Sequence, residues 1–518
     1  MREVRSKVFL AGAGPGAFDL ITMRAVGALS RADVVIYDYL VNPELLRLAP
    51  NDAKLIYAGK KGGGDGNIDQ GALNRMLIAH ARKGKTVVRL KGGDPFIFGR
   101  GGEEAEALAR ARVPFEVVPG VTSAIAAPAF AGIPLTHRDF GSFVTFVTGH
   151  EDERKRKGAI PWESLATAAR SGGTLVLLMA TARMRATLKR LVDGGLAGAT
   201  PAAAVQWGTT AAQRTVSATL ATLADACTRE RIGAPAAIVV GRCAELRQAL
   251  AWAEKMPLFG RRIVITRARD KASVFAAELA RLGAEVIEFP TIETAPPSSF
   301  ATLDRAIKAI DRFDWIIFTS ATGVEAFVER LKTLKRDIRS IGRASIAAIG
   351  PATAERLRDY ALNVAAMPAE FRAEAIIDAI GARKIAGARI LIPRAQVARE
   401  VLPKLLRQSG AREVVVAPAY RTVQPKGQGV DRLRTLTASN DIDLVAFTSS
   451  STVANFSAML GKNARGLKAA AIGPITADTA RRGGFDVVVE PADYTIPALV
   501  NAICRHFERA RANANASA

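Results

Sequence analysis

Short apolar runs alternate with Ala/Leu-rich stretches between Lys7 and Gly241, and this alternation narrows the range of possible folds more than any other feature. Each run is apolar for five or six residues and ends in glycine or a polar turn. Near-continuous apolar strands separated by helices are typical of parallel or mixed sheets with both faces covered. We therefore predict an α/β protein, with strands in the segments VFLAGAG, DVVIYD, KTVVRLKGG, FVTFVTG, TLVLLMA and PAAIVVG.

A second series of strands begins at Arg261, after a stretch with helical spacing (residues 244–256) and the helix-breaking segment PLFG. This part of the chain repeats itself. FTSATGVEAF at 318–327 resembles FTSSSTVANF at 447–456, and AAIGPATAERL at 347–357 resembles AAIGPITADTA at 470–480. Two matched motifs in the same order, about 125 residues apart, predict two related α/β lobes.

Charge and composition limit the kinds of partner and site. The net charge of +23, from 72 Lys and Arg against 49 Asp and Glu, favours an anionic partner. Three cysteines and four histidines, widely scattered, argue against a disulfide framework and against a metal cluster. The longest uncharged segment, residues 118–136, contains three prolines and two glycines, so we expect a buried helix there and no membrane span. No signal peptide is recognised, and the chain is expected to be soluble and cytoplasmic.

The first predicted strand runs into a glycine loop, VFLAGAGPG at residues 8–16. Glycine lets the backbone approach a ligand closely and present its N–H groups. Alone, this pattern also fits a dinucleotide site. Pro15 departs from the dinucleotide fingerprint, and Asp33 and Asp38 flank the next strand instead of occupying the ribose position. These departures argue against NAD.

Several further motifs together resemble uroporphyrinogen-III C-methyltransferase, of the tetrapyrrole methylase family. The run RLKGGDPFIFGRGGEE at 89–104 is highly specific within that family, and the resemblance covers about residues 7–245. It implies two α/β lobes, near residues 1–120 and 121–245, with S-adenosylmethionine between them. It also implies two successive methylations of uroporphyrinogen III, at C2 and C7, to give precorrin-2. The matching segments are residues 8–22, 34–41, 87–104, 116–123, 132–138 and 146–150.

The same resemblance assigns individual residues. It implies an acid–base pair at Asp38 and Lys60, where the residues alone would suggest a strand-end cap and a surface lysine. An electron-rich pyrrole carbon attacks a sulfonium methyl, so the site has to supply alignment and exclude water, and a group that takes up the ring proton can help. No metal is expected. The loop after Lys60, KKGGGDGNIDQ, lacks the family's usual histidine. The implied contacts to S-adenosylmethionine are Pro15, Gly92, Gly93, Asp94, Ile97, Thr122, Ser123, Met179 and Gly208.

Residues 261–507 resemble uroporphyrinogen-III synthase through VITRAR, the two FTS motifs, the two IGPxTA motifs and PAYRTV at 418–423. The resemblance implies lobe one at 261–292 plus 423–507 and lobe two at 293–422, joined by a two-stranded ladder. It also implies closure of hydroxymethylbilane with inversion of ring D, assisted by Tyr420. Serine and threonine after a strand also commonly cap the next helix. The candidates for binding substrate carboxylates are Arg267, Thr319, Ser320, Thr353, Arg394, Thr448, Ser449 and Thr476.

The prediction is thus a bifunctional enzyme with an N-terminal methylase (1–245), a linker (246–260), a synthase (261–507) and a disordered tail (508–518). Its expected partners are hydroxymethylbilane and uroporphyrinogen III, and the methylase resemblance implies a homodimer through that module. Three alternatives stay open: an RNA methylase, a methylase for a later precorrin, and a C-terminal half that acts only as a scaffold. Aromatic residues make up only 6% and show no basic–aromatic stacking pattern, so no nucleic-acid partner is expected.

Overall fold

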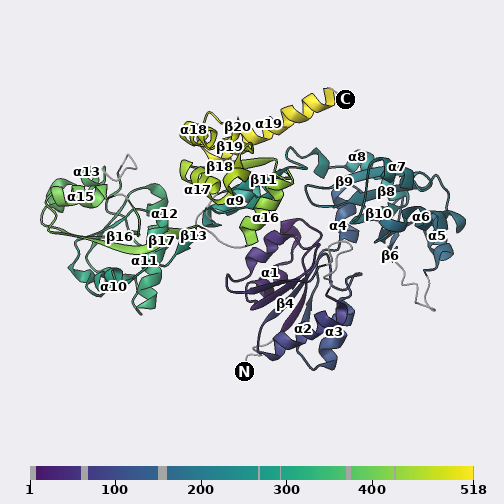
Figure 1. The fold of residues 1–518 in the computed structure, drawn as a ribbon, viewed down its shortest axis with the longest axis horizontal. Coiled ribbons are helices and arrows are strands. Elements are labelled where there is room, and N and C mark those ends of the chain that lie inside the picture. The colour runs from purple at the N-terminus through teal and green to yellow at the C-terminus, as the bar shows by residue number, and fades with distance from the viewer. Residues whose placement is uncertain are drawn as a thin grey trace. The chain divides into compact units, whose positions relative to one another are not determined.

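The computed structural model describes residues 7–59, 68–149, 160–266, 269–291, 293–368, 375–398, 400–424 and 428–516. These residues form four five-stranded sheets with helices between the strands (Figure 1). The predicted α/β class is confirmed. The chain divides into two compact units, one of Met1–Phe289, Leu436–Val453 and Ala464–Ala518, the other of Pro290–Thr435 and Ala454–Asn463.

The first sheet is entirely parallel, and helices cover both of its faces. Leu73, Leu77 and Leu108 pack on one face, and Ala25 and Leu29 on the other. The strand order is β3 (Lys54–Tyr57), β2 (Val34–Tyr37), β4 (Val87–Lys91), β1 (Val8–Gly12), β5 (Phe115–Val118). The helices are η1 (Phe18–Leu20), α1 (Met23–Leu29), η2 (Pro43–Leu48), α2 (Gln70–Arg82) and α3 (Gly101–Arg110).

The second sheet is mixed: its first two strands run parallel and the remaining neighbours antiparallel. The order is β6 (Phe143–Thr148), β7 (Gly173–Leu178), β10 (Ala236–Val240), β8 (Pro201–Gln206), β9 (Arg214–Thr219). One face is covered by α5 (Trp162–Arg170), α6 (Met184–Asp193) and α7 (Leu223–Arg229), with η3 (Thr181–Arg183) before α6, and the other by α4 (Ser123–Phe130). The long uncharged segment therefore contains a helix, as predicted. Among the described helices, none has both the length and the hydropathy that crossing a membrane requires.

Residues 242–255 form three short helical pieces and not the single helix expected from their spacing: η4 (Arg242–Leu246), α8 (Arg247–Leu250) and η5 (Ala253–Lys255). Hydrogen bonds to the end of α4 explain the break. The Arg247 guanidinium donates to the carbonyl of Ala131 at 2.8 Å, and the Trp252 indole donates to that of Ala129 at 2.9 Å. The segment predicted as a linker is therefore held against the end of α4.

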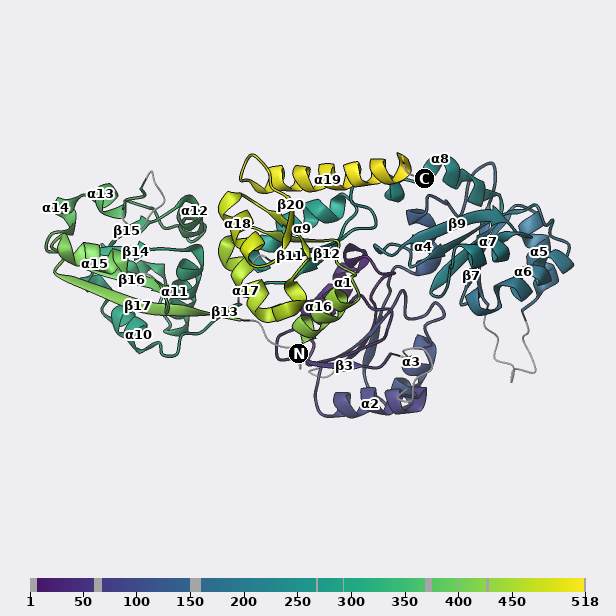
Figure 2. The ribbon, with the colours of Figure 1, turned by 45° about the horizontal axis from the view of Figure 1, so that its top comes forward.

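The third sheet is parallel and belongs to the first unit, in the order β12 (Glu285–Glu288), β11 (Arg262–Ile265), β18 (Leu444–Phe447), β19 (Lys468–Ala471), β20 (Asp486–Val489). Helices α9 (Arg269–Arg281) and α19 (Ile496–Ala516) share one core with it. The predicted disordered tail begins at residue 508, but α19 continues to Ala516 (Figure 2). The prediction is therefore wrong for residues 508–516. Alanine and arginine favour helix in that segment. The other helices in this part of the sequence are α16 (Gln428–Ala438), α17 (Ser450–Leu460), η8 (Gly461–Ala464) and α18 (Pro474–Arg482), of which the first three have residues in both units.

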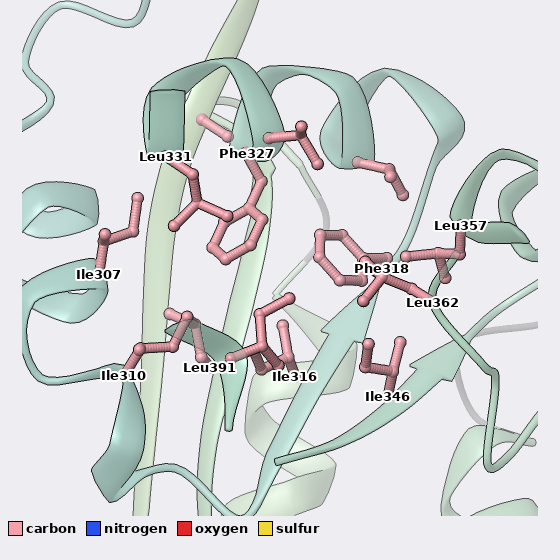
Figure 3. Packing of buried hydrophobic residues seen from close by; sticks show 14 of the residues in the cluster. Ile307, Ile310, Ile316, Phe318, Phe327, Leu331, Ile346, Leu357, Leu362 and Leu391 are labelled. Carbon is pink, nitrogen blue, oxygen red and sulfur yellow. The ribbon is translucent and has the colours of Figure 1, made fainter. Parts of the chain in front are cut away.

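The fourth sheet lies in the second unit, in the order β13 (Glu293–Ala295), β17 (Glu413–Val423), β16 (Arg389–Ala395), β14 (Trp315–Phe318), β15 (Ser345–Ala348). One face packs against α10 (Ala301–Lys308), α11 (Ala321–Thr333) and α12 (Pro351–Asp359), where the Phe318 and Phe327 rings meet edge to face (Figure 3). The other face packs against α13 (Ile376–Ile380), α14 (Ala382–Ile385) and α15 (Val401–Gln408). Two 3-10 helices, η6 (Ile310–Arg312) and η7 (Ile338–Ile341), lie between these elements.

The sequence repeats occupy equivalent places in the third and fourth sheets. Each FTS copy ends a strand and begins a helix, as β14–α11 and as β18–α17. Each IGP copy does the same, as β15–α12 and as β19–α18. The predicted pair of related α/β arrangements is therefore present in the structure.

Candidate functional site

Three loops meet at the carboxyl edge of the first sheet, where the strands of a parallel sheet commonly place a ligand. The loop after β1 pairs with the loop after β4: Gly93 N–H donates to the Gly14 carbonyl at 2.7 Å, and Gly14 N–H to the Gly93 carbonyl at 3.3 Å. The loop after β5 fits against both, since a Cβ on Gly12 would lie 2.5 Å from Gly120 Cα and from the Gly93 carbonyl. Only glycine permits this approach.

Asp94 braces these loops through its side chain. Its Oδ1 accepts from the N–H groups of Phe96 and Ile97 at 2.8 and 3.1 Å, and its Oδ2 accepts from Gly120 N–H at 3.0 Å. The carboxylate therefore fixes the loop after β4 against the loop after β5. Ile97, held by the first of these turns, keeps a partly exposed apolar side chain beside the loop.

Asp38 follows the end of β2 and is tied to the same loops. Its carboxylate accepts from Gly92 N–H at 3.3 and 3.4 Å and from Leu40 N–H at 3.1 Å. A guanidinium nitrogen of Arg89 lies 3.6 Å from Asp38 Oδ2. The structure thus brings the predicted acid–base carboxylate to the predicted cofactor loop. Lys60, its predicted partner, lies outside the described residues.

Below this edge lies a buried group of charged residues from the RLKGGDPFIFGRGGEE motif, for which the sequence alone predicts no role. Glu104 on α3 is fully buried, and its Oε1 accepts from Lys91 Nζ at 2.9 Å and from Arg89 Nε at 3.2 Å. Burial lowers the pKa of Lys91, nearby Arg89 lowers it further, and Glu104 opposes both. The alternation along β4 could have pointed to this group, because Arg89 and Lys91 share the face of buried Val87.

The second sheet contributes the remaining predicted contacts at the ends of β7 and β8. Met179 follows β7 with a left-handed backbone (φ 55°) and is half exposed, an arrangement that costs energy for a residue with a Cβ. Gly208 follows β8, and a Cβ there would lie 2.3 Å from Ala127 Cβ on α4. Beside it, the Thr209 hydroxyl accepts from Ala17 N–H at 3.0 Å, which joins this loop to the glycine loop after β1.

The remaining predicted cofactor residues lie at these same junctions. Thr122 is buried and caps α4, its hydroxyl accepting from Ala124 N–H at 3.2 Å, and Ser123 is the first residue of that helix. Pro15 is partly buried in the bend after β1. The described cofactor candidates thus lie on loops at the ends of β1, β4, β5, β7 and β8.

In the second unit, two predicted synthase residues form a direct pair. The hydroxyls of Ser320 and Tyr420 lie 3.1 Å apart, and Ser320 also caps α11 by accepting from Gly323 N–H at 3.1 Å. Arg394 on β16 is buried and forms an ion pair with the exposed carboxylate of Glu400. Thr353 is buried on α12, and Thr319 is partly buried beside Ser320.

The other predicted synthase residues belong to the first unit. Ser449 accepts from Thr452 N–H at 3.4 Å at the start of α17, so the helix-cap alternative holds for it as it does for Ser320. Thr448 is partly buried after β18, and Thr476 is buried on α18. Arg267 lies outside the described residues. Within the described ranges, no group of three or more His, Cys, Asp or Glu side chains is placed to hold a metal ion.

Comparison with known proteins agrees with both halves of this arrangement. A family model described as tetrapyrrole (corrin/porphyrin) methylases matches residues 7–224, and one described as uroporphyrinogen-III synthase HemD matches residues 273–501. The chain is 47% identical over 251 residues to a uroporphyrinogen-III C-methyltransferase of Bacillus subtilis (strain 168), covering 48% of this chain and 95% of that protein. A crystal structure of the Thermus thermophilus uroporphyrin-III C-methyl transferase complexed with S-adenyl homocysteine is 38% identical, covers 46% of this chain and 99% of that one, and has a TM-score of 0.39.

One relative spans both halves. The porphyrin biosynthesis protein HemD of Ruminiclostridium josui is 36% identical over 483 residues, which cover 93% of this chain and 94% of that protein. The two families therefore occur in one chain, in the same order, over nearly the full length of both proteins. The chain belongs to the family of porphyrin biosynthesis proteins in which a tetrapyrrole methylase is followed by a uroporphyrinogen-III synthase.

Proposed function

We propose that this chain carries out two successive reactions. The synthase half closes hydroxymethylbilane to uroporphyrinogen III with inversion of ring D, and the methylase half then adds two methyl groups, at C2 and C7, to give precorrin-2. The observation that carries the proposal is the hydrogen bond from Gly92 N–H to the Asp38 carboxylate, which joins a candidate base to the loop expected to hold the methyl donor. The full-length relative supports the combination of the two halves.

The residues at the loops fit S-adenosylmethionine. Gly92 and Gly93 carry no side chain that would stand between their N–H groups and a ligand, and Ile97 and Met179 offer exposed apolar surface. When bound, S-adenosylmethionine supplies an electrophilic methyl group. The loops orient the two reactants, which converts a bimolecular encounter into an aligned one. Asp38 then accepts the proton that the methylated ring releases.

In the synthase half, Tyr420 assists the loss of the hydroxyl group from hydroxymethylbilane. The hydroxyl leaves as water, so a proton has to reach its oxygen, and the phenol of Tyr420 donates a hydrogen bond to it. In the second unit, Arg394 and the hydroxyl residues at the end of β14 bind carboxylates of the substrate. The positive charge of the chain suits such polyanionic substrates.

A reconstitution experiment tests the proposal. Hydroxymethylbilane and S-adenosylmethionine are added to the purified chain, and the product is identified by mass and isomer analysis. The expected product is precorrin-2. Methylation of added uroporphyrinogen III without conversion of hydroxymethylbilane supports instead a C-terminal half that acts as a scaffold. Methylation of a later precorrin alone overturns the assigned substrate.

Assembly as a homodimer through the methylase half is part of the same proposal. Sedimentation of the intact chain over a range of concentrations tests it, and a single monomeric species throughout would reject the dimer.

A further inference from the structure

We propose that the buried charges of Arg89, Lys91 and Glu104, here called the charge cluster, position the Asp38 carboxylate for methyl transfer. The inference rests on the proposed function, because it assigns Asp38 the task of accepting a proton. None of the three residues belongs to the acid–base pair or to the cofactor contacts assigned above. They are positioning residues that act on the reaction through Asp38.

The charge cluster occupies a place where the rest of the sheet is apolar. Val8, Leu10 and Ile36 form the core on this face of the first sheet, together with helices α2 and α3. Near the carboxyl end of β4 the same face carries the side chains of Arg89 and Lys91, both almost completely buried. Burying two cations is costly unless anions and hydrogen bonds compensate them. Because apolar side chains would fill this space at lower cost, we infer that the buried charges serve the function of the site.

The three nitrogens of the Arg89 guanidinium contact different groups. Nε donates to Glu104 Oε1 at 3.2 Å, and Nη1 donates to the carbonyls of Leu90 and Ile36 at 3.1 and 3.4 Å. These contacts fix the plane of the group. Nη2 then lies 3.6 Å from Asp38 Oδ2. A planar guanidinium held in this way fixes the place of a charge more firmly than a flexible ammonium group does.

Glu104 holds the cations in place and is itself anchored by α2. Its Oε1 accepts from Lys91 at 2.9 Å and from Gln70 Nε2 at 3.3 Å, while its buried Oε2 has no hydrogen-bond partner within the described residues. Four charged side chains therefore lie close together: Arg89 and Lys91 face the carboxylate of Glu104, and Arg89 also faces that of Asp38.

The result is a carboxylate held from two sides. Gly92 and Leu40 bind it through their N–H groups, and Arg89 faces it from within the sheet. An orienting partner of this kind limits the directions in which Asp38 can meet the ring proton. Without Arg89, the carboxylate keeps its backbone contacts but loses its charged neighbour, so the rate of methyl transfer should fall while binding of the methyl donor persists.

A double-mutant cycle on the intact chain tests the inference. The variants are Arg89→Gln, Arg89→Lys, Asp38→Asn and the Asp38→Asn/Arg89→Gln double variant, with Arg110→Gln, an exposed position on α3, as control. Calorimetric titration with S-adenosylmethionine counts the folded sites, and methylation of added uroporphyrinogen III is expressed per site. We expect kcat to fall about 10- to 100-fold in Arg89→Gln, with affinity for S-adenosylmethionine changed less than about threefold. Arg110→Gln should behave as the unchanged chain.

The double variant distinguishes a failure of the inference about Arg89 from a failure of the proposed role of Asp38. If Arg89 acts through Asp38, the double variant is no slower than Asp38→Asn by more than about threefold, since the two effects are then coupled. If the losses in kcat of the two single variants multiply in the double variant, the inference is overturned, whereas the role of Asp38 stands. Full activity of Asp38→Asn overturns the proposed base and, with it, the inference.

Arg89→Lys covers the case in which Arg89→Gln does not fold. It keeps the positive charge, so the cluster stays balanced, but one ammonium group cannot hold Glu104, Ile36 and Asp38 in the geometry of the guanidinium. We expect a reduced kcat with KM for uroporphyrinogen III changed less than about threefold. Full activity in Arg89→Lys would show that only the charge is needed and would overturn the positioning role.

Discussion

The hydroxyl of Tyr420 on β17 lies 3.1 Å from the hydroxyl of Ser320, which caps α11. Because Ser320 Oγ already accepts from Gly323 N–H, the same oxygen serves both the helix and the tyrosine. The local fold of one FTS motif thus fixes the direction of the phenol. This arrangement links a helix cap, whose usual role is structural, to the residue proposed to assist ring closure.

Removing either hydroxyl should slow formation of uroporphyrinogen III. For Tyr420→Phe we expect kcat for hydroxymethylbilane to fall about 10- to 100-fold, in the range of a lost general acid. Ser320→Ala should cause a smaller loss, because the phenol persists without its orienting partner. Ser320→Thr keeps the hydroxyl and should retain most of the activity. The measurement is the initial rate together with the isomer ratio of the product.

Methylation of added uroporphyrinogen III is the internal control for these variants. It should be unchanged in all three, since Ser320 and Tyr420 belong to the second unit and the methylase loops to the first. A joint loss of both activities would point to misfolding and would reject separate sites.

Asp94 should matter for binding of the methyl donor through the backbone that it holds. Asp94→Ala removes the acceptor for three N–H groups, one of which is that of Gly120 on the neighbouring loop. Leaving such groups unpaired costs about 1–3 kcal/mol each when they are buried, and partial exposure reduces this. We expect affinity for S-adenosylmethionine to fall at least about tenfold by calorimetry.

Two further variants test whether the lost hydrogen bonds of Asp94 cause the weaker binding of S-adenosylmethionine. Asp94→Asn keeps one acceptor oxygen and should bind with intermediate affinity. Asp193→Ala removes an exposed carboxylate at the end of α6 and should bind as the unchanged chain does. Unaltered affinity in Asp94→Ala would mean that the methyl donor is held elsewhere.

Glu104 should carry a large share of the stability of the first sheet. Glu104→Gln leaves Arg89 and Lys91 buried without their anion, and breaking a buried ion pair in this way costs about 3–5 kcal/mol. Glu106→Gln on the same helix removes only an exposed pair with Arg110 and should cost less than about 0.5 kcal/mol. Thermal unfolding of the two variants gives the comparison. Adding Lys91→Met to Glu104→Gln should restore part of the loss, and equal melting of all variants would reject the electrostatic account.

Sequence reasoning predicts the parts of this fold that depend on local signals. Apolar runs give strands such as β1, β2 and β4, and glycine spacing gives the loops around Gly12 and Gly93. The motif repeats correspond to equivalent strand–helix pairs in two sheets because a cap such as Ser320 or Ser449 acts within a few residues. Local sequence signals therefore predict only a helix-capping role for Ser320. Its contact with Tyr420 spans 100 positions and appears only in the structure.

Long-range pairing accounts for what the sequence did not predict. The charge cluster joins β4 to α3. Alternation along β4 places Arg89 and Lys91 on the face of buried Val87, but their pairing with Glu104 depends on how α3 packs against the sheet. The break of the helix after residue 246 depends on Arg247 and Trp252 reaching the carbonyls at the end of α4. The tail up to Ala516 looked too small and polar for a fixed structure, yet alanine and arginine extend α19 through it.

Asp304 and Arg330 should give the second unit a pH-dependent contribution to stability. Arg330 donates two hydrogen bonds to the Asp304 carboxylate at 2.6 Å each, and its guanidinium lies 4.1 Å from the centre of the Phe300 ring. These bonds, aided by the charges of Arg330 and Lys308 and opposed by burial, lower the pKa of Asp304. A carboxyl group whose pKa is lower in the folded chain than in the unfolded chain stabilises the fold above the unfolded pKa, near 4. That contribution is lost as the pH falls through the lowered pKa.

Asp304→Asn should therefore destabilise the second unit at pH 7 by about 0.5–1 kcal/mol, the range for a well-formed but partly exposed pair. The difference from the unchanged chain should shrink once the pH drops below about 4 and vanish once Asp304 is protonated in the folded state as well. Urea unfolding followed by the fluorescence of Trp315, which is buried in this unit, measures the free energy of unfolding, with a Trp315→Phe chain identifying the contribution of the other tryptophans. Asp311→Asn, at an exposed position in the same unit, is the matched control. A difference between Asp304→Asn and the unchanged chain that stays constant from pH 7 to pH 2 would show that the pair contributes through packing and not through charge.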